Sequence, residues 1–315
     1  MNGPFIPPRY DGRMSVHERV AASQPNLRLS RRSVILGGLG GIALVAAVPG
    51  GYALAEAMGL VVTHYRPALP AWPPGRKLTI TVIADLHAGG PNMGLRRVEE
   101  VVEVANLQKS DLIVLLGDYF ATHRFVTEHV PPEAWAGALA RLDAPLGVWA
   151  ILGNHDWWYG IEPTRNALRK VGIPVLENEA KLLGHAPHRF WLAGLADQLA
   201  HPLGHGRFRG EDDLPGTLAR LTTDDPAILL VHEPDIFTEV SDRVALTLAG
   251  HTHGGQLRIP LIWPSLVPSM YGARFAYGHV AEQGRHMIVS GGIGTSKVPA
   301  RLGVPPEIVR IVLGE

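Results

Sequence analysis

Short, mostly apolar runs recur along the chain from residue 78 onward. Runs this short and this apolar are typical of strands that are buried on both faces by covering layers. The pattern therefore predicts strands over Leu78–Ala84, Leu112–Leu116, Val148–Leu152, Ile228–Val231, Val244–Ala249 and Met287–Val289.

A helical periodicity separates the first two runs. Over Leu95–Leu107, apolar residues recur on one stripe and charged side chains occupy the other faces, which predicts an amphipathic helix. Further helices are expected over Glu133–Leu142 and from Pro163 to about Val171. Helices alternate with strands early, and strands follow one another later, so we expect an α/β fold, a layered sandwich of mixed sheets. The stripe of the first helix consists of Val98, Val101, Val102 and Ala105.

The N-terminal part of the chain has a different character. An uncharged segment of small and aliphatic residues, Ser33–Ala55, follows Ser30-Arg31-Arg32-Ser33 and resembles a twin-arginine (Tat) export signal. Small-x-small sequences at Ala53-Leu54-Ala55 and Ala55-Glu56-Ala57 fit signal cleavage. Retention as a membrane anchor is the alternative, because about 20 apolar residues span a bilayer. In both cases we expect the bulk of the protein to be periplasmic or otherwise extracytoplasmic, with residues 33–55 as the possible anchor in the inner membrane.

These features divide the chain into four parts. Residues 1–32 form a basic n-region, and residues 33–57 form the signal or anchor. Residues 58–75 form an extended strand and a Pro-rich connector. Residues 76–315 form the main domain.

Charge and composition narrow the chemistry. The 315 residues contain 29 basic and 29 acidic side chains, so the chain has no basic excess, and we expect no nucleic-acid partner. Six of the basic and three of the acidic side chains lie in residues 1–57, which leaves the remainder mildly acidic. Because the chain has no Cys, disulfides, thiolate nucleophiles and iron–sulfur clusters are excluded. Any metal ion must therefore bind nitrogen and oxygen ligands.

Side chains that can bind metals follow almost every apolar run. The ends of neighbouring strands share one edge of an α/β sheet, so clusters far apart in sequence can converge there. In the first cluster, Asp85 and His87 are two residues apart on what we expect to be an extended segment, which would point both to the same side. The clusters are Asp85-Leu86-His87, Gly117-Asp118, Gly153-Asn154-His155-Asp156, His232 and Gly250-His251-Thr252-His253.

This ordered set resembles the calcineurin-like metallophosphoesterase superfamily. Three longer strings, Ala84–His87, His232–Asp235 and Gly250–Gln256, resemble a bacterial branch of phosphodiesterases that often carry twin-arginine signals. The resemblance implies an α-β-β-α sandwich with two mixed sheets and a dimetal site at the strand ends. It also implies that residues 76–315 are a catalytic domain.

Roles for individual residues follow from the resemblance alone. A hydroxide held between two divalent ions would attack the phosphate ester. His155 would protonate the leaving group, and Asp156 would orient the His155 ring. Mn, Fe or Zn would suit these ligands. One ion would be held by Asp85, His87, Asp118 and His253, and the other by Asp118, Asn154, His232 and His251.

The expected activity is hydrolysis of a phosphomonoester or phosphodiester, lipid-linked substrates included, by an envelope enzyme that the twin-arginine machinery exports. One alternative is a hydrolase of UDP-2,3-diacylglucosamine in lipid A synthesis, although that substrate faces the cytoplasm. Another is a non-catalytic metal-binding envelope protein. A protein Ser/Thr phosphatase is disfavoured, because Tyr119-Phe120-Ala121 follows Asp118 where that branch has Asp-Arg-Gly.

Two neighbouring segments have less definite roles. Trp157, Trp158 and Tyr159 follow the last residue of a metal-binding cluster, and we expect the rings to pack beneath the site, with a lipid or sugar platform as the alternative. Residues 198–215 form either a lid that supplies Arg207 or Arg209 to a phosphate, or a solvated loop.

Overall fold

The apolar runs assemble into two sheets in the computed structural model, which describes residues 51–261 and 263–315. The basic n-region and most of the expected signal or anchor lie outside the described residues. In the part of the chain that is described, no helix is both long enough and apolar enough to cross a bilayer.

The first sheet has five strands in the order β1-β13-β2-β3-β4. Strands β2, β3 and β4 are parallel, and β13 pairs antiparallel with β2 and parallel with β1, so the sheet is mixed. The last strand of the chain therefore lies between the first two. The strands are β1 (Val61–Tyr65), β2 (Leu78–Ile83), β3 (Leu112–Leu116), β4 (Val148–Ile151) and β13 (Glu307–Leu313).

The second sheet has six strands in the order β11-β12-β10-β9-β6-β5. Its four inner strands are parallel, and both edge strands pair antiparallel with their neighbours. The strands are β5 (Glu179–Leu183), β6 (Phe190–Gly194), β9 (Ala227–Leu230), β10 (Val244–Ala249), β11 (Gly278–Glu282) and β12 (Arg285–Val289).

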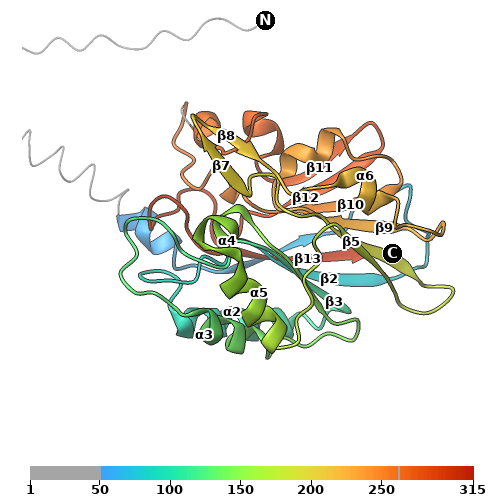
Figure 1. The fold of residues 1–315 in the computed structure, drawn as a ribbon, viewed down its shortest axis with the longest axis horizontal. Coiled ribbons are helices and arrows are strands. Elements are labelled where there is room, and N and C mark those ends of the chain that lie inside the picture. Colours follow the sequence, from blue (N-terminus) through green and yellow to red (C-terminus); the bar gives the residue numbers. More distant parts are fainter. Residues whose placement is uncertain (1–50, 262) are drawn as a thin grey trace, which may run out of the picture. The chain divides into compact units, whose positions relative to one another are not determined.

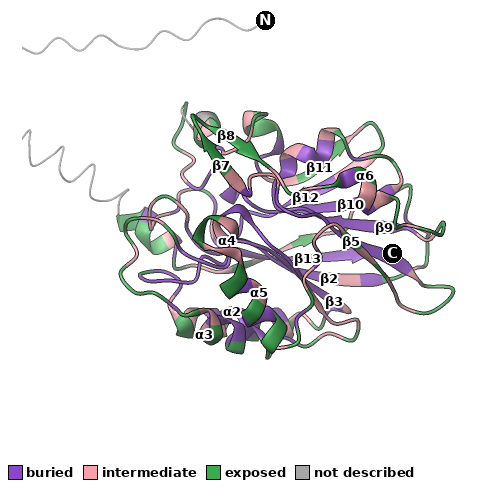
Figure 2. Ribbon diagram, viewed as in Figure 1, coloured by how far each residue is buried: buried purple, intermediate pink, exposed green. Residues whose placement is uncertain are grey.

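Helices cover the outer faces of the two sheets, giving the four layers of an α-β-β-α sandwich (Figure 1). One apolar cluster joins the first sheet to α2, α3 and α5, a second fills the space between the sheets, and a third joins the second sheet to α6, η1 and η4. The inner strands are correspondingly buried, and the outer helices expose their far faces (Figure 2). The helices are α2 (Leu95–Leu107), α3 (Pro132–Leu139), α5 (Ile161–Lys170), α6 (Leu214–Leu218), η1 (Pro234–Thr238) and η4 (Gly272–Phe275).

Short elements complete the described fold. Helix α4 (Asn154–Tyr159) directly follows β4, and the hairpin of β7 (His201–Gly204) and β8 (Arg207–Arg209) lies against α4. Two 3-10 turns, η2 (His253–Gly255) and η3 (Trp263–Leu266), follow β10.

The predicted fold class is confirmed, and so are all six predicted strands, each within two residues of an observed one. The first predicted helix has the bounds of α2, and its stripe is buried. The sequence pattern missed β5, β6, β7, β8, β11 and β13. Edge strands β5 and β11 carry polar residues on exposed positions and so lack an apolar run.

Candidate metal centre

The candidate ligands follow the carboxyl ends of parallel strands in both sheets. These strands are β2, β3 and β4 of the first sheet and β9 and β10 of the second. All of the candidate ligands are buried. The structure therefore brings together residues from five separate sequence clusters, as expected. They are Asp85, His87, Asp118, Asn154, His232, His251 and His253.

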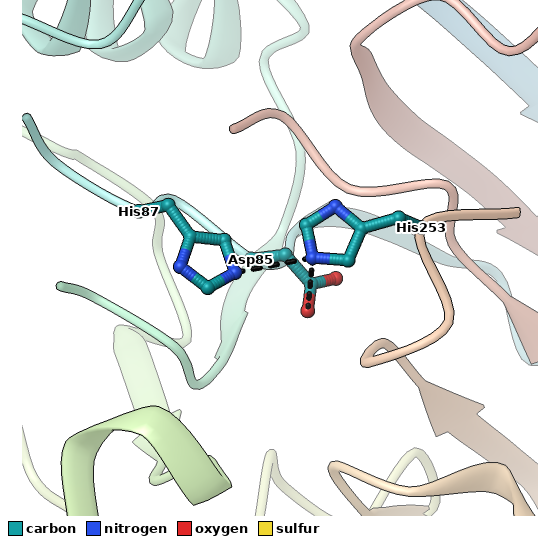
Figure 3. A group of neighbouring side chains, drawn as sticks. All are labelled: Asp85, His87 and His253. Atoms are coloured by element: carbon teal, nitrogen blue, oxygen red, sulfur yellow. Dashed lines mark hydrogen bonds and ion pairs between the residues drawn. The ribbon is translucent and has the colours of Figure 1, made fainter. Parts of the chain in front are cut away.

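One group consists of Asp85, His87 and His253, whose ligand atoms all lie within 4.8 Å of one another. The Nε2 atoms of His87 and His253 are 3.1 Å apart, and Nε2 of His253 is 3.8 Å from Oδ1 of Asp85. Figure 3 shows the two rings and the carboxylate pointing toward a common centre.

A second group lies beside it. Asp118, His232 and His251 form another cluster of potential ligands. The Oδ1 atom of Asn154 lies 3.1 Å from Nε2 of His232 and 2.9 Å from Nδ1 of His251. This amide oxygen therefore faces the same point as the two rings.

Asp118 connects the two groups. Its Oδ2 atom lies 3.5 Å from Nε2 of His87, in the first group, and 3.2 Å from Nε2 of His232, in the second. Its Oδ1 atom accepts a hydrogen bond of 2.8 Å from the backbone N–H of His155. One carboxylate thus faces both groups.

Backbone carbonyls orient two of the rings. Nδ1 of His87 is 2.7 Å from the carbonyl oxygen of Phe120, and Nδ1 of His232 is 2.7 Å from that of Leu116. A carbonyl oxygen only accepts, so both Nδ1 atoms donate, and Nε2 of either ring presents a lone pair to the centre whenever that ring is neutral.

This donor set fits divalent cations. Nε2 of His232 faces two oxygen acceptors, and Oδ2 of Asp85 is buried with no hydrogen-bond partner among the described residues. Converging lone pairs repel one another unless a positive charge lies among them. Nitrogen and oxygen atoms in this number suit borderline ions.

The pKa values show which groups of the centre hold a proton when no cation is bound. Burial alone would lower the pKa of His232, but the Asp118 carboxylate raises it well above the usual range, so a proton occupies this ring when no cation does. Burial lowers the pKa of His87 and of His251 to about 3, which keeps both rings neutral. Burial, with the Asp118 charge adding to it, raises the pKa of Asp85 to about 7.

The backbone at the ligands adopts an uncommon conformation. Asp85, His87, Asp118, His251 and His253 all have φ between 44° and 67°, a region that non-glycine residues rarely occupy and that costs free energy. The expectation that Asp85 and His87 lie on an extended segment is wrong, because β2 ends at Ile83 and left-handed turns bring the two side chains together.

Gly153 allows the closest approach in the site. A Cβ atom at this position would collide with the Asp118 carboxylate and would lie 2.6 Å from the His232 ring. Only glycine lets the β4–α4 turn pass this close to the ligands.

His155 lies beside the first group, with its ring centroid 4.8 Å from that of His87. Burial lowers its pKa. Its Nδ1 atom pairs with the hydroxyl of Thr122, a residue that the sequence analysis did not select. The ring is therefore held by the segment that follows Asp118.

The expected contact between Asp156 and the His155 ring is not what the structure shows. The Asp156 carboxylate accepts hydrogen bonds of 2.9 Å from the backbone N–H groups of Gly153, Asp118 and Tyr119. A residue at the third position of a helix points back toward the helix start, so Asp156 fixes the two turns that carry Asp118 and Asn154.

Two aromatic side chains near the site are exposed. Trp158 and Tyr159 are 41% and 51% exposed, so the expectation that the three rings pack beneath the site is wrong for these two, whereas Trp157 is partly buried. The Trp158 ring lies 5.1 Å from His155 and stacks on Phe208 of the β7–β8 hairpin at 5.7 Å. Residues 198–215 include this hairpin, on which Arg207 and Arg209 are exposed.

Further buried charged residues surround the site without having been selected from the sequence. Arg301 is fully buried and places Nη2 3.2 Å from Nδ1 of His253. Asp197 and Glu233 form a buried pair next to His232. Burial and the Glu233 charge raise the pKa of Asp197 well above its usual range. Asp197 follows the end of β6, just as the candidate ligands follow the ends of other strands. A sequence pattern that predicted β6 would therefore have selected Asp197 as a further candidate site residue.

Comparisons with known proteins agree on one family. A family model described as calcineurin-like phosphoesterase matches residues 78–255, which include every candidate ligand. An uncharacterized metallophosphoesterase of Aquifex aeolicus is 32% identical over 85% of this chain and 97% of its own length. The uncharacterized metallophosphoesterase YkuE of Bacillus subtilis is 31% identical over 91% of this chain and 98% of its own length. Phosphodiesterase YaeI of Escherichia coli is 31% identical over 74% of this chain and 81% of its own length.

Proposed function

The chain belongs to the calcineurin-like phosphoesterase family and is a metal-dependent phosphoric ester hydrolase, and from this premise we propose that it is a dinuclear phosphodiesterase of the cell envelope. The observation that carries the proposal is the position of Asp118, whose Oδ2 atom faces two separate groups of buried ligands at 3.5 and 3.2 Å.

Each group would hold one divalent ion, with Asp118 shared. When bound, the ions would lower the pKa of a coordinated water toward neutrality and offset the charge of the phosphoryl oxygens. Asn154 contributes a neutral oxygen, so it adds no negative charge to repel the substrate. One ion would be held by the first group, Asp85, His87 and His253, together with Asp118, and the other by Asp118, Asn154, His232 and His251.

His155 supplies the proton for the leaving group. Its ring lies at the edge of the first group, and Thr122 holds Nδ1, which leaves Nε2 as the atom that donates. Asp156 acts as a positioning residue, because its three backbone bonds fix the turns on either side of the site.

Diesters are the proposed substrate class, and monoesters are the second possibility. The Escherichia coli relative YaeI, a phosphodiesterase, supports diesters. A non-catalytic role is disfavoured, because every ligand position is occupied by a residue that can bind a metal.

The test is metal removal and restoration. Protein stripped with a chelator should lose hydrolysis of bis(p-nitrophenyl) phosphate and regain it with Mn²⁺, Fe²⁺ or Zn²⁺, at a stoichiometry of two ions per chain measured by elemental analysis. A broad panel of mono- and diesters with no metal-dependent turnover would contradict the proposal.

Export by the twin-arginine machinery is the proposed route to the envelope, with cleavage or anchoring by residues 33–55. Its support is Ser30-Arg31-Arg32-Ser33 ahead of an uncharged segment. A C-terminal reporter active only after export should work in the wild type and fail when Arg31 and Arg32 are both changed to Lys. If a C-terminal reporter that functions only in the cytoplasm were active in the wild type, this route would be refuted.

A further inference from the structure

Two polar residues of the longer motif strings do not reach the ligands. Asp235, at the end of His232–Asp235, accepts hydrogen bonds from the Ser269 hydroxyl at 2.5 Å and the Met270 backbone N–H at 2.7 Å. It therefore fixes the segment that follows η3.

Gln256, at the end of Gly250–Gln256, fixes a different segment. Its Oε1 atom accepts from the backbone N–H of Ser296 at 2.9 Å, and its Nε2 atom donates to the carbonyls of Val298 at 2.7 Å and Ala300 at 3.0 Å. Both motif residues thus hold loops rather than metals.

A cavity of about 230 Å³ lies between these loops. His253 forms part of its wall, so the cavity opens beside the metal centre. Figure 3 shows the same His253 ring turned toward Asp85 and His87. His253 is thus common to the cavity and the metal centre, and a substituent of a bound ester that extends past His253 would enter the cavity. The apolar wall is made by Leu257, Leu266, Pro268 and Val298.

The size of the cavity restricts what it can hold. Ligand pockets for whole small molecules are usually about 300 to 1,000 Å³, whereas an apolar cavity of about 150 Å³ already binds benzene. Lys297 also lines the cavity, is exposed, and makes no ion pair with the described residues. Its charge favours an anionic ester at the cavity mouth.

We propose that this cavity binds a hydrocarbon group, alkyl or aryl, of the phosphodiester substrate, on the ester arm that is not cleaved, because the cleaved arm would face His155, which does not line the cavity. The inference rests on the proposed phosphodiesterase function and names its substrate class.

The test uses p-nitrophenyl phosphodiesters in which the second arm is methyl, ethyl, butyl or phenyl. Because p-nitrophenolate is the leaving group in every ester, differences in kcat/KM report the effect of the second arm. Burying one methylene favours binding by about fourfold. We therefore expect kcat/KM of the metal-loaded enzyme to rise by up to about fourfold per methylene from methyl to butyl, with phenyl comparable to butyl.

Variants locate the effect. Val298→Trp fills the cavity and should remove the difference between the butyl and methyl esters, and Leu266→Ser should reduce it. Leu107→Ser changes an equally apolar side chain that is 72% exposed at the end of α2, and it should keep the wild-type difference.

Binding provides an independent readout. Calorimetry with methyl- and butylphosphonate, which are not hydrolysed, should show a lower Kd for the butyl compound in the wild type and equal Kd values in Val298→Trp. If the enzyme cleaves the esters but neither kcat/KM nor Kd depends on the second group, the inference is overturned. If no ester is cleaved, the proposed function fails, and the phosphonate affinities alone decide the inference.

Discussion

The Nε2 atom of His232 lies 3.2 Å from Oδ2 of Asp118, and Nδ1 of the same ring lies 2.7 Å from the carbonyl oxygen of Leu116. The carbonyl fixes which nitrogen donates, and the other nitrogen is thereby directed at the shared carboxylate. The end of β3 thus supplies both the carboxylate, two residues later, and the contact that orients its partner.

Replacing Asp118 by Asn should abolish metal-dependent hydrolysis. The amide removes the negative charge that faces both groups, so each of the two proposed ions should bind more weakly. Because losing a residue that merely supports a ligand costs about 10- to 100-fold in affinity or activity, we expect kcat/KM to fall by more than about 100-fold. Elemental analysis of the purified variant should show fewer than two ions per chain; wild-type stoichiometry with full activity would contradict the shared role.

Replacing His155 by Gln should slow the reaction according to the leaving group. A positioned acid contributes about 10²- to 10⁴-fold when the leaving group needs a proton. The loss should be large for an alkyl leaving group and small for p-nitrophenolate, which leaves without protonation. A plot of log kcat/KM against leaving-group pKa should be steeper for the variant. Equal slopes would assign His155 a different role.

Asp156→Ala should destabilise the fold. Three buried backbone N–H groups would lose their acceptor, at about 1 to 3 kcal/mol each, so we expect the free energy of unfolding to fall by at least about 3 kcal/mol in urea denaturation. Asp143→Ala, at an exposed carboxylate, should change it by less than about 0.5 kcal/mol. Similar decreases in the free energy of unfolding for Asp156→Ala and Asp143→Ala would argue against the positioning role of Asp156.

Two arginines that bond to carbonyls should differ in their contribution to stability. Arg301 is fully buried and donates to the carbonyls of Gly291, Gly294 and Val304. Arg301→Met should therefore cost on the order of 3 to 5 kcal/mol. Arg285 also donates to three carbonyls but is partly exposed, so water can replace it.

Arg285→Met is the matched control, and it should lower the free energy of unfolding by about 1 kcal/mol. Urea denaturation of the metal-free proteins measures both changes. A larger loss in Arg285→Met would show that burial of the guanidinium is not what makes Arg301 important.

Metal affinity should depend on pH in two stages. Asp85, with a pKa of about 7, and His232, with a raised pKa, must both release a proton when metal binds, whereas His87 and His251, with pKa values of about 3, are already neutral above pH 5. Fewer protons leave above pH 7, where Asp85 is already ionised, than below it, so affinity should fall as the pH is lowered and should fall more steeply below pH 7.

Competition with a metal indicator at several pH values measures this dependence. Asp85→Asn should bind metal more weakly overall and lose the steeper stage, because only the His232 proton remains. A wild-type affinity that does not change between pH 6 and 8 would contradict the proposed titration.

The sequence alone determined the buried parallel strands, helix α2 and the residues that converge on the metal centre. Each of these is a local pattern: an apolar run marks a buried strand, and the polar residue directly after it lies at the sheet edge. Strands such as β3 and β10 could be bounded to the residue for this reason.

Only the tertiary structure decided how the ligands are held. The left-handed turns at Asp85 and His87, the three backbone bonds of Asp156 and the burial of Arg301 depend on segments far apart in the chain. Their partners are chosen by how the two sheets pack, and no local periodicity records that packing. The exposure of Trp158 was misjudged for the same reason, because it depends on where the β7–β8 hairpin lies.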